Sequence, residues 1–510
     1  MKEGFWKNLL PRNAGDPLRL IREIGEVRSR DEHRALTLDL DDQDLDPQAL
    51  GHGRLATRED LEDKLLLGDQ GVPIGYFEGK PIRYPRGASG LIYGPPGIGK
   101  DTTHLAHILA DFGGAQGPCP SQFIVDVAGE SWEMSADYRE RMQKKPPQRI
   151  APFRTDGVRY NPIQPLIDLH ANEQSLALHK YEIAKGFVPP DLRAHEGSWV
   201  RRKAINLTAD LIHQDVYQHR HHCTPGAIFD QLNGGPEALA ERFVAMSNGN
   251  DPHLAQAGRR YLFELDHSPR EFGFAVDEAA EFLSIYQHGS ALRAATAATD
   301  ISPAMLKANS CTVYFEIPGD MLFVARQYVA AVINSFIEGV AMAEGKTRTL
   351  FLANEFTQIG TIPSLRKALR LYRKYGLTFI LYAQSRAAVE EVYGEQGRRD
   401  IEETCEFIQI LATDDPGLLR DISTWSGTAS VEVVTHTLSG GPSPAVSRQV
   451  AVHTRPVLQA EDIRSLGGDE MLIKFQNMAP IILAERRHWQ SDARLRQVLR
   501  DPSKMPGLVK

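Results

Sequence analysis

Short apolar segments alternate with longer amphipathic ones from about residue 84 to the end of the chain. The apolar segments are rich in β-branched and aromatic side chains, which favour buried strands. Strands followed by helical patterns are typical of βαβ units, so an α/β core around a parallel sheet is expected. The expected strands are 91–93, 123–127, 311–317, 349–353, 377–383 and 407–412.

A long interval, roughly 163–309, interrupts this alternation and carries helical periodicity instead. We therefore expect an all-α domain inserted into the α/β core. Nearer the end of the chain, residues 471–475 and 480–484 flank a short turn and predict a hairpin. The residues that recur on one helical face within the interval are Val200, Ala204, Leu207 and Leu211.

The same patterns divide the chain into five parts. The first carries an acidic run, Asp39–Asp46, that predicts a solvated linker; contact with a basic partner is the alternative. The expected parts are an N-terminal extension (1–50), the first part of the core (51–165), the inserted all-α domain (166–300), the second part of the core (301–495) and a C-terminal tail (496–510).

Composition narrows the class of protein without giving its activity. The chain has 510 residues, of which 42% are hydrophobic and 24% charged, as in a multidomain globular protein rather than a disordered or coiled-coil one. The net charge of −8 gives no overall sign of nucleic-acid binding, so any such surface must be local.

The sequence shows no pattern for membrane insertion or secretion. The stretch 324–343 carries Arg326, Asn334 and Glu338, whereas a bilayer span needs about 18–20 nearly uninterrupted apolar residues. Residues 1–30 contain no apolar signal-peptide segment. The four cysteines are scattered without a CxxC pair, which suits a reducing compartment. We therefore expect a soluble cytoplasmic protein.

A phosphate-binding loop is the strongest chemical motif. Gly94 and Gly99-Lys100 have its spacing, an apolar strand precedes them and a helical pattern follows. Glycines let backbone N–H groups converge on phosphate oxygens, and the helix N-terminus adds partial positive charge. Lys100 is expected to reach the β- and γ-phosphates. The expected nucleotide-binding residues are Gly94, Pro95, Pro96, Gly97, Ile98, Gly99, Lys100, Asp101 and Thr102.

Two positions depart from the usual Mg²⁺-binding pattern. The residue after the lysine is usually Ser or Thr, but here it is Asp101, which could ligate the metal or repel the phosphates. The strand beside the loop usually ends in Asp-Glu, whereas the strand 349–353 ends in Asn354-Glu355, so metal affinity should fall. The candidate metal ligands are Asp101, Thr102 and Asn354.

The ends of two strands carry candidate catalytic side chains. Glu355 is the best candidate for the general base that polarises the attacking water; a strand-end cap is the alternative. Gln384 follows the strand 377–383, where a neutral amide could sense the γ-phosphate, orient water or simply bond the loop.

The most basic short segment is an expected helix, 363–375, between these two strands. Arg366, Arg370 and Arg373 share one of its faces. That face is a solvated surface, a phosphate-contacting surface or the source of an arginine finger for a neighbouring subunit. Arg373 stands just ahead of the next strand, so it is our candidate for the finger.

In their order, the motifs resemble those of the coupling-protein ATPases of type IV secretion and conjugation, the TraG/TraD family. The resemblance covers roughly residues 50–490 and is most specific from Leu350 to Gly394. The motifs that carry it are Gly51–Arg58, Gly94–Lys100, Asp126–Glu133, Tyr160–Pro162, Leu350–Gly360, Lys374–Gly376, Tyr382–Ser385, Glu391–Gly394 and Asp414–Thr428.

This resemblance implies a RecA-like P-loop NTPase core with an inserted all-α domain, and a homo-hexameric ring with ATP and Mg²⁺ at the subunit interfaces. Lys100 would bind phosphates and Glu355 would be the catalytic acid. Gln384 would be the sensor, and Arg373 the arginine supplied in trans. The implied partners are DNA (single- or double-stranded) or a secreted protein, relaxosome components and the secretion channel.

The sequence departs from the family pattern at four points. Asp101 and Asn354 alter the Mg²⁺ shell, and Ala128 replaces the usual lysine near the site. Asp101 could compensate for the carboxylate that is missing at Asn354, because it could ligate the metal directly from the position after Lys100. Family members usually begin with transmembrane helices, for which the sequence offers no candidate; a position at the inner membrane would then depend on partners.

Three functions fit these features. The first is an ATPase that couples hydrolysis to the recruitment and transfer of DNA or protein, and the retained candidate catalytic residues favour it. The second is a substrate receptor switched by nucleotide with little or no hydrolysis, which the altered Mg²⁺ shell favours. The third is a DNA translocase outside secretion, similar to the FtsK/HerA motors, against which the motifs at 51–58 and 126–133 argue.

Overall fold

The structure is a computed structural model. The expected N-terminal extension 1–50, Ala128 and residues 503–510 of the expected tail lie outside the residues it describes. The described ranges are 51–69, 71–84, 88–110, 120–127, 129–169, 172–191, 199–439 and 445–502.

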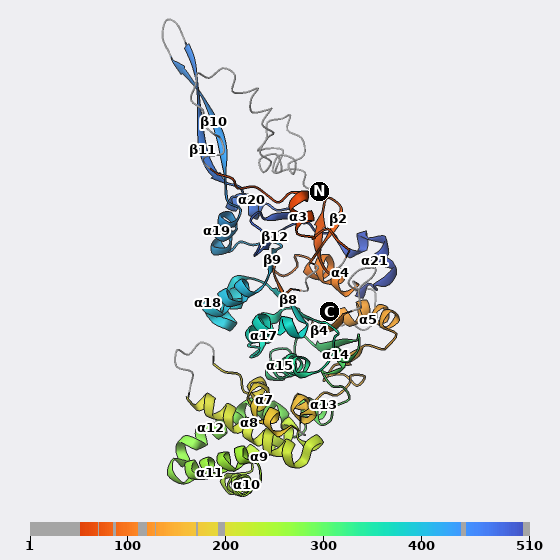
Figure 1. The fold of residues 1–510 in the computed structure, drawn as a ribbon, viewed down its shortest axis with the longest axis vertical. Helices are drawn as coiled ribbons and strands as arrows, with labels where there is room; N and C mark the ends of the chain where they lie inside the picture. The colour runs from red at the N-terminus through yellow and green to blue at the C-terminus, as the bar shows by residue number, and fades with distance from the viewer. Residues whose placement is uncertain are drawn as a thin grey trace.

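One mixed sheet organises the α/β core (Figure 1). In the described part of the chain it has 11 strands, in the order β2-β1-β13-β12-β9-β3-β8-β7-β4-β6-β5. The strands from β9 to β5 run parallel, and every pairing on the other side of β9 is antiparallel. The strands are β1 (Val72–Phe77), β2 (Lys80–Tyr84), β3 (Gly90–Tyr93), β4 (Ser121–Val127), β5 (Gln148–Ile150), β6 (Thr312–Ile317), β7 (Thr349–Ala353), β8 (Leu377–Ala383), β9 (Phe407–Ile410), β12 (Glu470–Phe475) and β13 (Ile482–Glu485).

The strand predictions are confirmed. All six expected strands are present within two residues of their expected bounds, and the predicted hairpin is β12 with β13. The sequence does not predict β1, β2 or β5. A Pro and a Gly interrupt β1, and β5 has only three residues, so neither gives a clear period-two pattern.

Both faces of the parallel strands are buried. Leu91 and Tyr93 of β3 join one hydrophobic cluster, whereas Ile92 joins the other, as alternation along a strand requires. Residues of α15 (Arg326–Met342) and α18 (Arg386–Thr404) belong to the first cluster, and those of α4 (Ala106–Leu109) and α5 (Glu130–Gln143) to the second. Burial on both faces explains why these strands are continuous apolar runs in the sequence.

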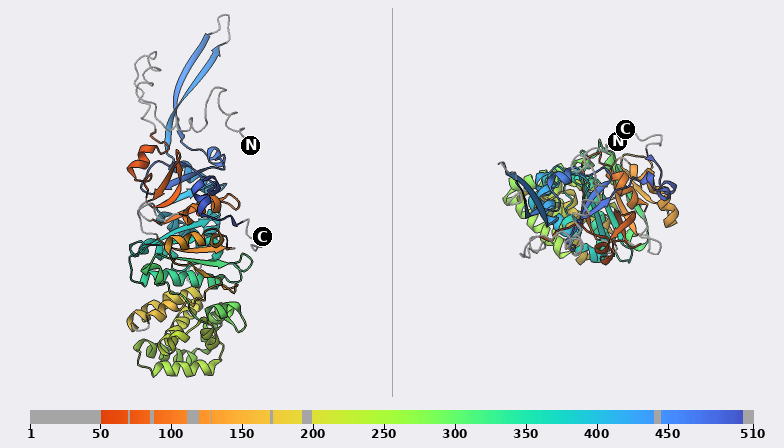
Figure 2. Two further views of the ribbon diagram at one scale, coloured as in Figure 1. Left: turned by 90° about the vertical axis from the view of Figure 1, so that its right-hand side faces the viewer. Right: turned by 90° about the horizontal axis from the view of Figure 1, so that it is seen from above.

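The all-α domain lies at one end of the molecule, beyond the helices under the sheet (Figures 1 and 2). The predicted helix with Val200 and Leu211 on one face is its longest helix, α8, and α7 packs on α15 of the core. Within the described ranges, the helices do not combine the length and the apolarity needed to cross a bilayer. The domain contains α7 (Glu173–Phe187), α8 (Trp199–His219), α9 (Pro225–Leu232), α10 (Pro236–Ser247), α11 (Pro252–His267), α12 (Pro269–Leu283) and α13 (Ala291–Thr296).

A two-stranded ribbon projects from the opposite end of the molecule (Figures 1 and 2). Its strands, β10 (Thr428–Ser439) and β11 (Ala445–Pro456), pair antiparallel along their whole length, and a bridge from His52 to Ala429 holds its base. The sequence does not predict this ribbon. The remaining helices are α3 (Arg58–Asp63), the π-helical turn η2 (Asp101–Leu105), α6 (Gln164–Asp168), α14 (Met305–Ala308), α16 (Phe356–Ile359), α17 (Leu365–Leu371), α19 (Pro416–Trp425), α20 (Ala460–Arg464) and α21 (Ala493–Val498).

A buried charged cluster joins three helices of the all-α domain. Lys180 Nζ of α7 donates to Asp210 Oδ1 of α8 at 2.7 Å and lies 3.2 Å from His213 Nδ1. His213 Nε2 lies 3.1 Å from Oδ2 of Asp251, whose other oxygen caps the start of α11. Burial and the nearby Lys180 lower the pKa of His213 to about 4, against the opposing effect of the two aspartates. His213 is therefore neutral in the folded domain near pH 7.

The low pKa of His213 predicts an acid-sensitive all-α domain. The unfolded chain, with a histidine pKa of about 6.5, binds a proton that the folded domain takes up only near pH 4. This contribution to stability is therefore complete above about pH 6.5 and is lost as the pH falls toward 4. Hydrogen-exchange protection of α8 and α11, corrected for the intrinsic exchange rate, should fall in this window.

Two variants separate this effect from other titrating groups. His213→Asn should flatten the dependence of the protection on pH, because no group at that position then takes up a proton. His267→Asn, at an exposed position of α11, should leave the dependence as in the wild type. The same pH profile in His213→Asn and the wild type would show that His213 is not responsible.

Candidate active site

The phosphate-binding loop joins β3 to the helix that starts after Lys100. Gly97 has a φ of +76° and Gly99 of +85°, a left-handed backbone that glycine adopts without strain and that turns the loop back toward the helix. The Gly94 N–H donates to the Ala383 carbonyl at 3.1 Å, which fixes the start of the loop to the end of β8. The loop therefore lies at the carboxyl edge of the parallel strands, where such folds bind their ligands.

Lys100 forms an ion pair with Glu355, which is the second residue after β7. Lys100 is buried, and its burial lowers the pKa of its ammonium while the adjacent Asp101 opposes this effect. Glu355 has a φ of +53°, a region that non-glycine residues rarely occupy and that often marks functional sites. Two of the four side chains that the sequence suggests for catalysis are thus in direct contact.

Two glutamine amides donate to the other oxygen of Glu355. Gln384 Nε2, just after β8, lies 3.0 Å from Glu355 Oε2. Gln358 Nε2, in the short helix α16, lies 3.1 Å from the same atom. The sequence predicts Gln384 at the site but not Gln358, whose only signal is its i+3 spacing from Glu355. The described side-chain contacts of this carboxylate are therefore with Lys100, Gln358 and Gln384.

The order of the strands explains this meeting and corrects one expectation. β3 pairs with β8 and β9, and β7 pairs with β8 on its far side. The expectation that the strand ending in Asn354-Glu355 lies beside the loop strand is wrong, because β8 lies between them. This order places Gln384, at the end of the middle strand, beside Glu355, to which its amide donates.

Asp101 and Asn354 also meet at this edge. Asn354 Nδ2 donates to Asp101 Oδ1 at 2.9 Å, and Asn354 Oδ1 is buried without a hydrogen-bond partner among the described residues. Burial raises the pKa of Asp101, against the opposing effects of Lys100 and of the Asn354 bond. Thr102 Oγ1 is close by and donates to the Gly99 carbonyl at 3.2 Å. A buried, unpaired oxygen beside a carboxylate is a donor set that suits a hard divalent cation.

Arg373 lies at the other end of β8 from Gln384. It precedes the strand, in a 3₁₀ turn after α17, and it is half-exposed and paired with Glu406. A seven-residue strand is roughly 20 Å long, so Arg373 does not reach the phosphate loop of its own chain. A contact between this arginine and nucleotide therefore requires a second subunit.

Three more basic side chains of this segment pair with carboxylates of the same chain. Arg366 and Arg370 both contact Asp400, and Lys367 Nζ lies 2.9 Å from Glu182 and 2.7 Å from Glu338. The helix is also shorter than expected, since α17 covers Leu365–Leu371 and a 3₁₀ turn follows. These pairs compensate part of the positive charge of the segment, whereas the Lys374 ammonium lies over the Tyr375 ring.

Arg486 is a further basic residue at the loop that the sequence analysis does not identify. It follows β13, it is buried, and its Nη1 donates to the Ile98 carbonyl at 3.0 Å. Burial lowers the pKa of its guanidinium. Its place at the loop depends on the return of β13 to the sheet, which no local sequence pattern around residue 486 reveals.

The chain has the fold of a RecA-like P-loop NTPase core with an inserted all-α domain. Residues 119–507 match the family model described as "Type IV secretory system Conjugative DNA transfer", so the chain belongs to that family. This match confirms the resemblance to coupling-protein ATPases found in the sequence.

Individual relatives agree with this assignment. The type IV secretion system-coupling protein VirD4 of Bartonella quintana (strain Toulouse) is 29% identical over 186 residues, which are 36% of this chain and 29% of that protein. The match therefore spans less than a third of that relative's length. The bacterial conjugative coupling protein TrwBdeltaN70, in a trigonal form with sulphate, has a TM-score of 0.62 and 17% identity and covers 85% of this chain and 93% of its own. The plasmid coupling protein TrwB in complex with ADP and Mg²⁺ has a TM-score of 0.60 and 15% identity, with 86% of this chain and 93% of its own covered.

Proposed function

We propose that this chain binds ATP with Mg²⁺, hydrolyses it, and couples the cycle to the recruitment and transfer of DNA or protein substrates by a type IV secretion system. One observation carries the proposal. Lys100, Glu355 and Gln384, from three separate segments of the sequence, converge at the carboxyl edge of adjacent strands. The binding of ADP and Mg²⁺ by TrwB, which has the same fold, supports a nucleotide at this edge.

Each side chain has a role that its position allows. Lys100 and backbone N–H groups of the loop between Gly97 and Thr102 bind the phosphates. Glu355 polarises the attacking water, and Gln384 orients that water or senses the γ-phosphate. Because ATP has to displace the ion pair, Lys100 moves from Glu355 to the phosphates when nucleotide binds. The carboxylate is then free to accept a proton from water.

The residues at Asp101 and Asn354 fit a metal ion. Mg²⁺, when bound, would neutralise phosphate charge and stabilise the transition state. Asp101 would ligate it directly, and the buried Asn354 oxygen would take part directly or through water, with the Thr102 hydroxyl nearby. The charged metal ligand would thus be Asp101, in the helix after the phosphate loop, rather than a carboxylate at the end of β7.

The position of Arg373, far from the phosphate loop of its own chain, motivates the proposed assembly of subunits. We propose a homo-hexameric ring in which Arg373 leaves Glu406 and reaches the nucleotide of the neighbouring subunit. The ring would act on the cytoplasmic side of the inner membrane, held there by partners. Relaxosome components or secreted proteins would be recruited through the all-α domain and passed to the secretion channel.

A nucleotide-switched receptor with little hydrolysis is the second candidate function. The changed metal ligands and the ion pair that occupies both Lys100 and Glu355 favour it. The family match favours both secretion functions over a DNA translocase outside secretion of the FtsK/HerA type.

ATP turnover, measured with and without single-stranded DNA, separates the two candidates. Lys100→Ala removes the phosphate-binding cation and Glu355→Gln removes the base. Each should lower turnover by about 100-fold or more, the scale of general-base catalysis. Lys145→Ala and Glu403→Gln change exposed residues of the same types and should match the wild type. DNA-stimulated turnover lost in both site variants supports the ATPase, whereas ATP binding without turnover in the wild type supports the receptor.

Substitutions at the two unusual positions test whether Asp101 ligates the metal ion. Asp101→Thr should weaken Mg²⁺-dependent binding of a non-hydrolysable ATP analogue by about tenfold or more, because the only charged metal ligand is lost. Adding Asn354→Asp, which returns a carboxylate to the end of β7, should recover most of that affinity. Asp101→Ala puts no ligand in place of the carboxylate, so unchanged Mg²⁺-dependent binding in Asp101→Ala would rule out Asp101 as a ligand.

A further inference from the structure

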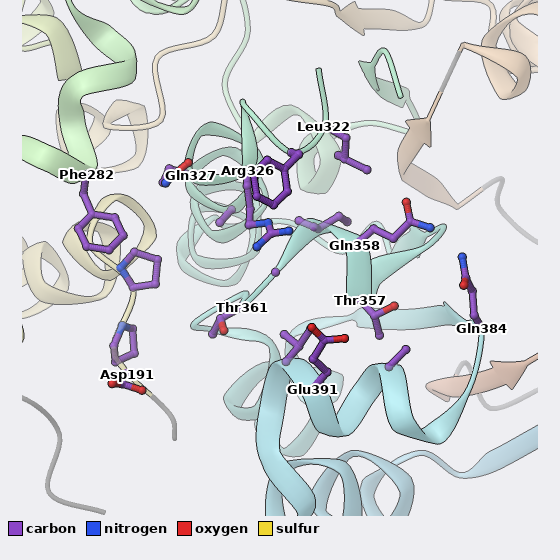
Figure 3. A pocket seen from close by; sticks show the side chains of 18 of the residues that line it. Asp191, Phe282, Leu322, Arg326, Gln327, Thr357, Gln358, Thr361, Gln384 and Glu391 are labelled. Atoms are coloured by element: carbon purple, nitrogen blue, oxygen red, sulfur yellow. The ribbon is translucent and has the colours of Figure 1, made fainter. Parts of the chain in front are cut away.

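A large cavity separates the all-α domain from the carboxyl edge of the sheet. Its volume is about 870 Å³, the size of a small-molecule or nucleotide site. Figure 3 shows Gln358 and Gln384 of the core at one end and Asp191 and Phe282 of the helical domain at the other. Arg326 and Gln327, at the start of α15, lie between the two ends (Figure 3). Amide groups, guanidinium groups and two carboxylates, those of Asp191 and Glu391, therefore share the cavity with an apolar wall.

The segment 321–326, which joins β6 to α15, exposes an unusual amount of apolar surface at this cavity. Phe323 is 73% exposed and Val324 63%, and Met321 is also exposed. Leu322 and Phe323 line the cavity. An aromatic ring left in water costs free energy that burial against another group would recover, so a cluster of this kind marks a contact site.

Arg326 lies over the exposed ring. Its guanidinium carbon is 4.6 Å from the centroid of Phe323. Its stem packs on Gly360, where a Cβ would lie 2.8 Å from Arg326 Cδ. In the described part of the chain, no carboxylate lies within ion-pair distance of Arg326, although most arginines at the core have one. Arg326 thus lies against an aromatic ring without an ion-pair partner among the described residues, although the carboxylates of Asp191 and Glu391 line other parts of the cavity.

The cavity and the candidate active site share side chains. Gln358 and Gln384 line the cavity, and each donates to Glu355 Oε2. Gln358 is exposed, and it belongs to α16, which ends at the same Gly360 that supports Arg326. A ligand that bonds the Gln358 amide would therefore compete with the Glu355 carboxylate for it.

We propose that this cavity binds a single-stranded nucleic acid and that its occupancy is transmitted to the active site through Gln358. A base stacks on Phe323, a phosphate pairs with Arg326, and the strand takes the Gln358 amide away from Glu355. Stacking on an aromatic ring and pairing with a fixed arginine bind any sequence, as transfer of DNA requires. The proposal rests on the proposed function for its ATP site, but its DNA contact stands on Phe323 and Arg326 alone.

Binding of a fluorescent oligothymidylate, measured by anisotropy without nucleotide, tests the contact. Phe323→Ala should weaken binding by about 5- to 100-fold, the range for loss of one base–aromatic stack. Arg326→Gln should also weaken it and should lower the dependence of log affinity on log salt by about 0.7, the value for one phosphate contact on a single strand. Phe263→Ala, on α11, removes a ring that is 59% exposed but distant from the cavity, and should bind as the wild type does. Both exposed positions tolerate substitution without a change of core packing.

Wild-type affinity in Phe323→Ala would overturn the nucleic-acid site. So would an equal loss in Phe263→Ala, because it would report a general change rather than a contact. If the exposed segment binds an extended protein instead, Phe323→Ala and Arg326→Gln will both leave oligonucleotide binding intact.

The transmission through Gln358 is tested by the affinity for a non-hydrolysable ATP analogue, with and without the oligonucleotide. The wild type should show a change of about threefold or more, and by linkage the analogue should change oligonucleotide affinity by the same factor. Gln358→Leu should still bind the oligonucleotide within about threefold of the wild type, since Phe323 and Arg326 remain, but the change should disappear. An undiminished change in Gln358→Leu would overturn the transmission. Neither readout requires hydrolysis, so failure here is distinguishable from an absence of ATP turnover.

Discussion

The Glu355 carboxylate holds together the side chains of the candidate active site. Its Oε1 pairs with Lys100 of the phosphate loop, and its Oε2 accepts from Gln358 and Gln384. These contacts join three elements, the loop after β3, the end of β7 and the end of β8, and they hold a backbone conformation that few non-glycine residues adopt. Because a pair of buried charges is stable only while both are present, anything that takes Lys100 away changes the charge balance of the whole edge. Nucleotide is such a competitor, since its phosphates attract the same ammonium.

The candidate active site also borders the cavity that faces the all-α domain. Gln358 and Gln384, which donate to Glu355, line one end of this cavity, and Asp191 and Phe282 of the helical domain line the other. Separately, Lys367 of α17 bridges Glu338 of the core and Glu182 of α7. The core therefore has two physical routes to the inserted domain, one through this charged bridge and one through a ligand that spans the cavity. The family shown by the match at 119–507 transfers DNA, and such routes are what a machine of that kind needs if nucleotide and substrate are to influence each other.

The sequence predicts those parts of the structure that local patterns encode. Parallel strands buried on both faces give unbroken apolar runs, so six of the seven described parallel strands could be found, and the residues Glu355 and Gln384 stand out because polar side chains follow such runs. The order of the strands is not encoded locally, which is why β8 was not expected between β3 and β7. Arg486 reaches the loop only through tertiary proximity, and the arginines of the 363–375 segment are paired with Asp400 and Glu406, which lie further along the chain. The ribbon of β10 and β11 lies outside the βαβ pattern altogether.

We propose that Glu355 holds Lys100 until nucleotide replaces it. The most direct test is an experimental structure of the chain with a non-hydrolysable ATP analogue and Mg²⁺, compared with one without ligand. We predict that Lys100 Nζ contacts the β- and γ-phosphates and lies beyond ion-pair distance of Glu355, with Asp101 on the metal and Gln384 still at the carboxylate. A bound analogue with the Lys100–Glu355 pair intact would show that nucleotide does not displace Lys100 from Glu355.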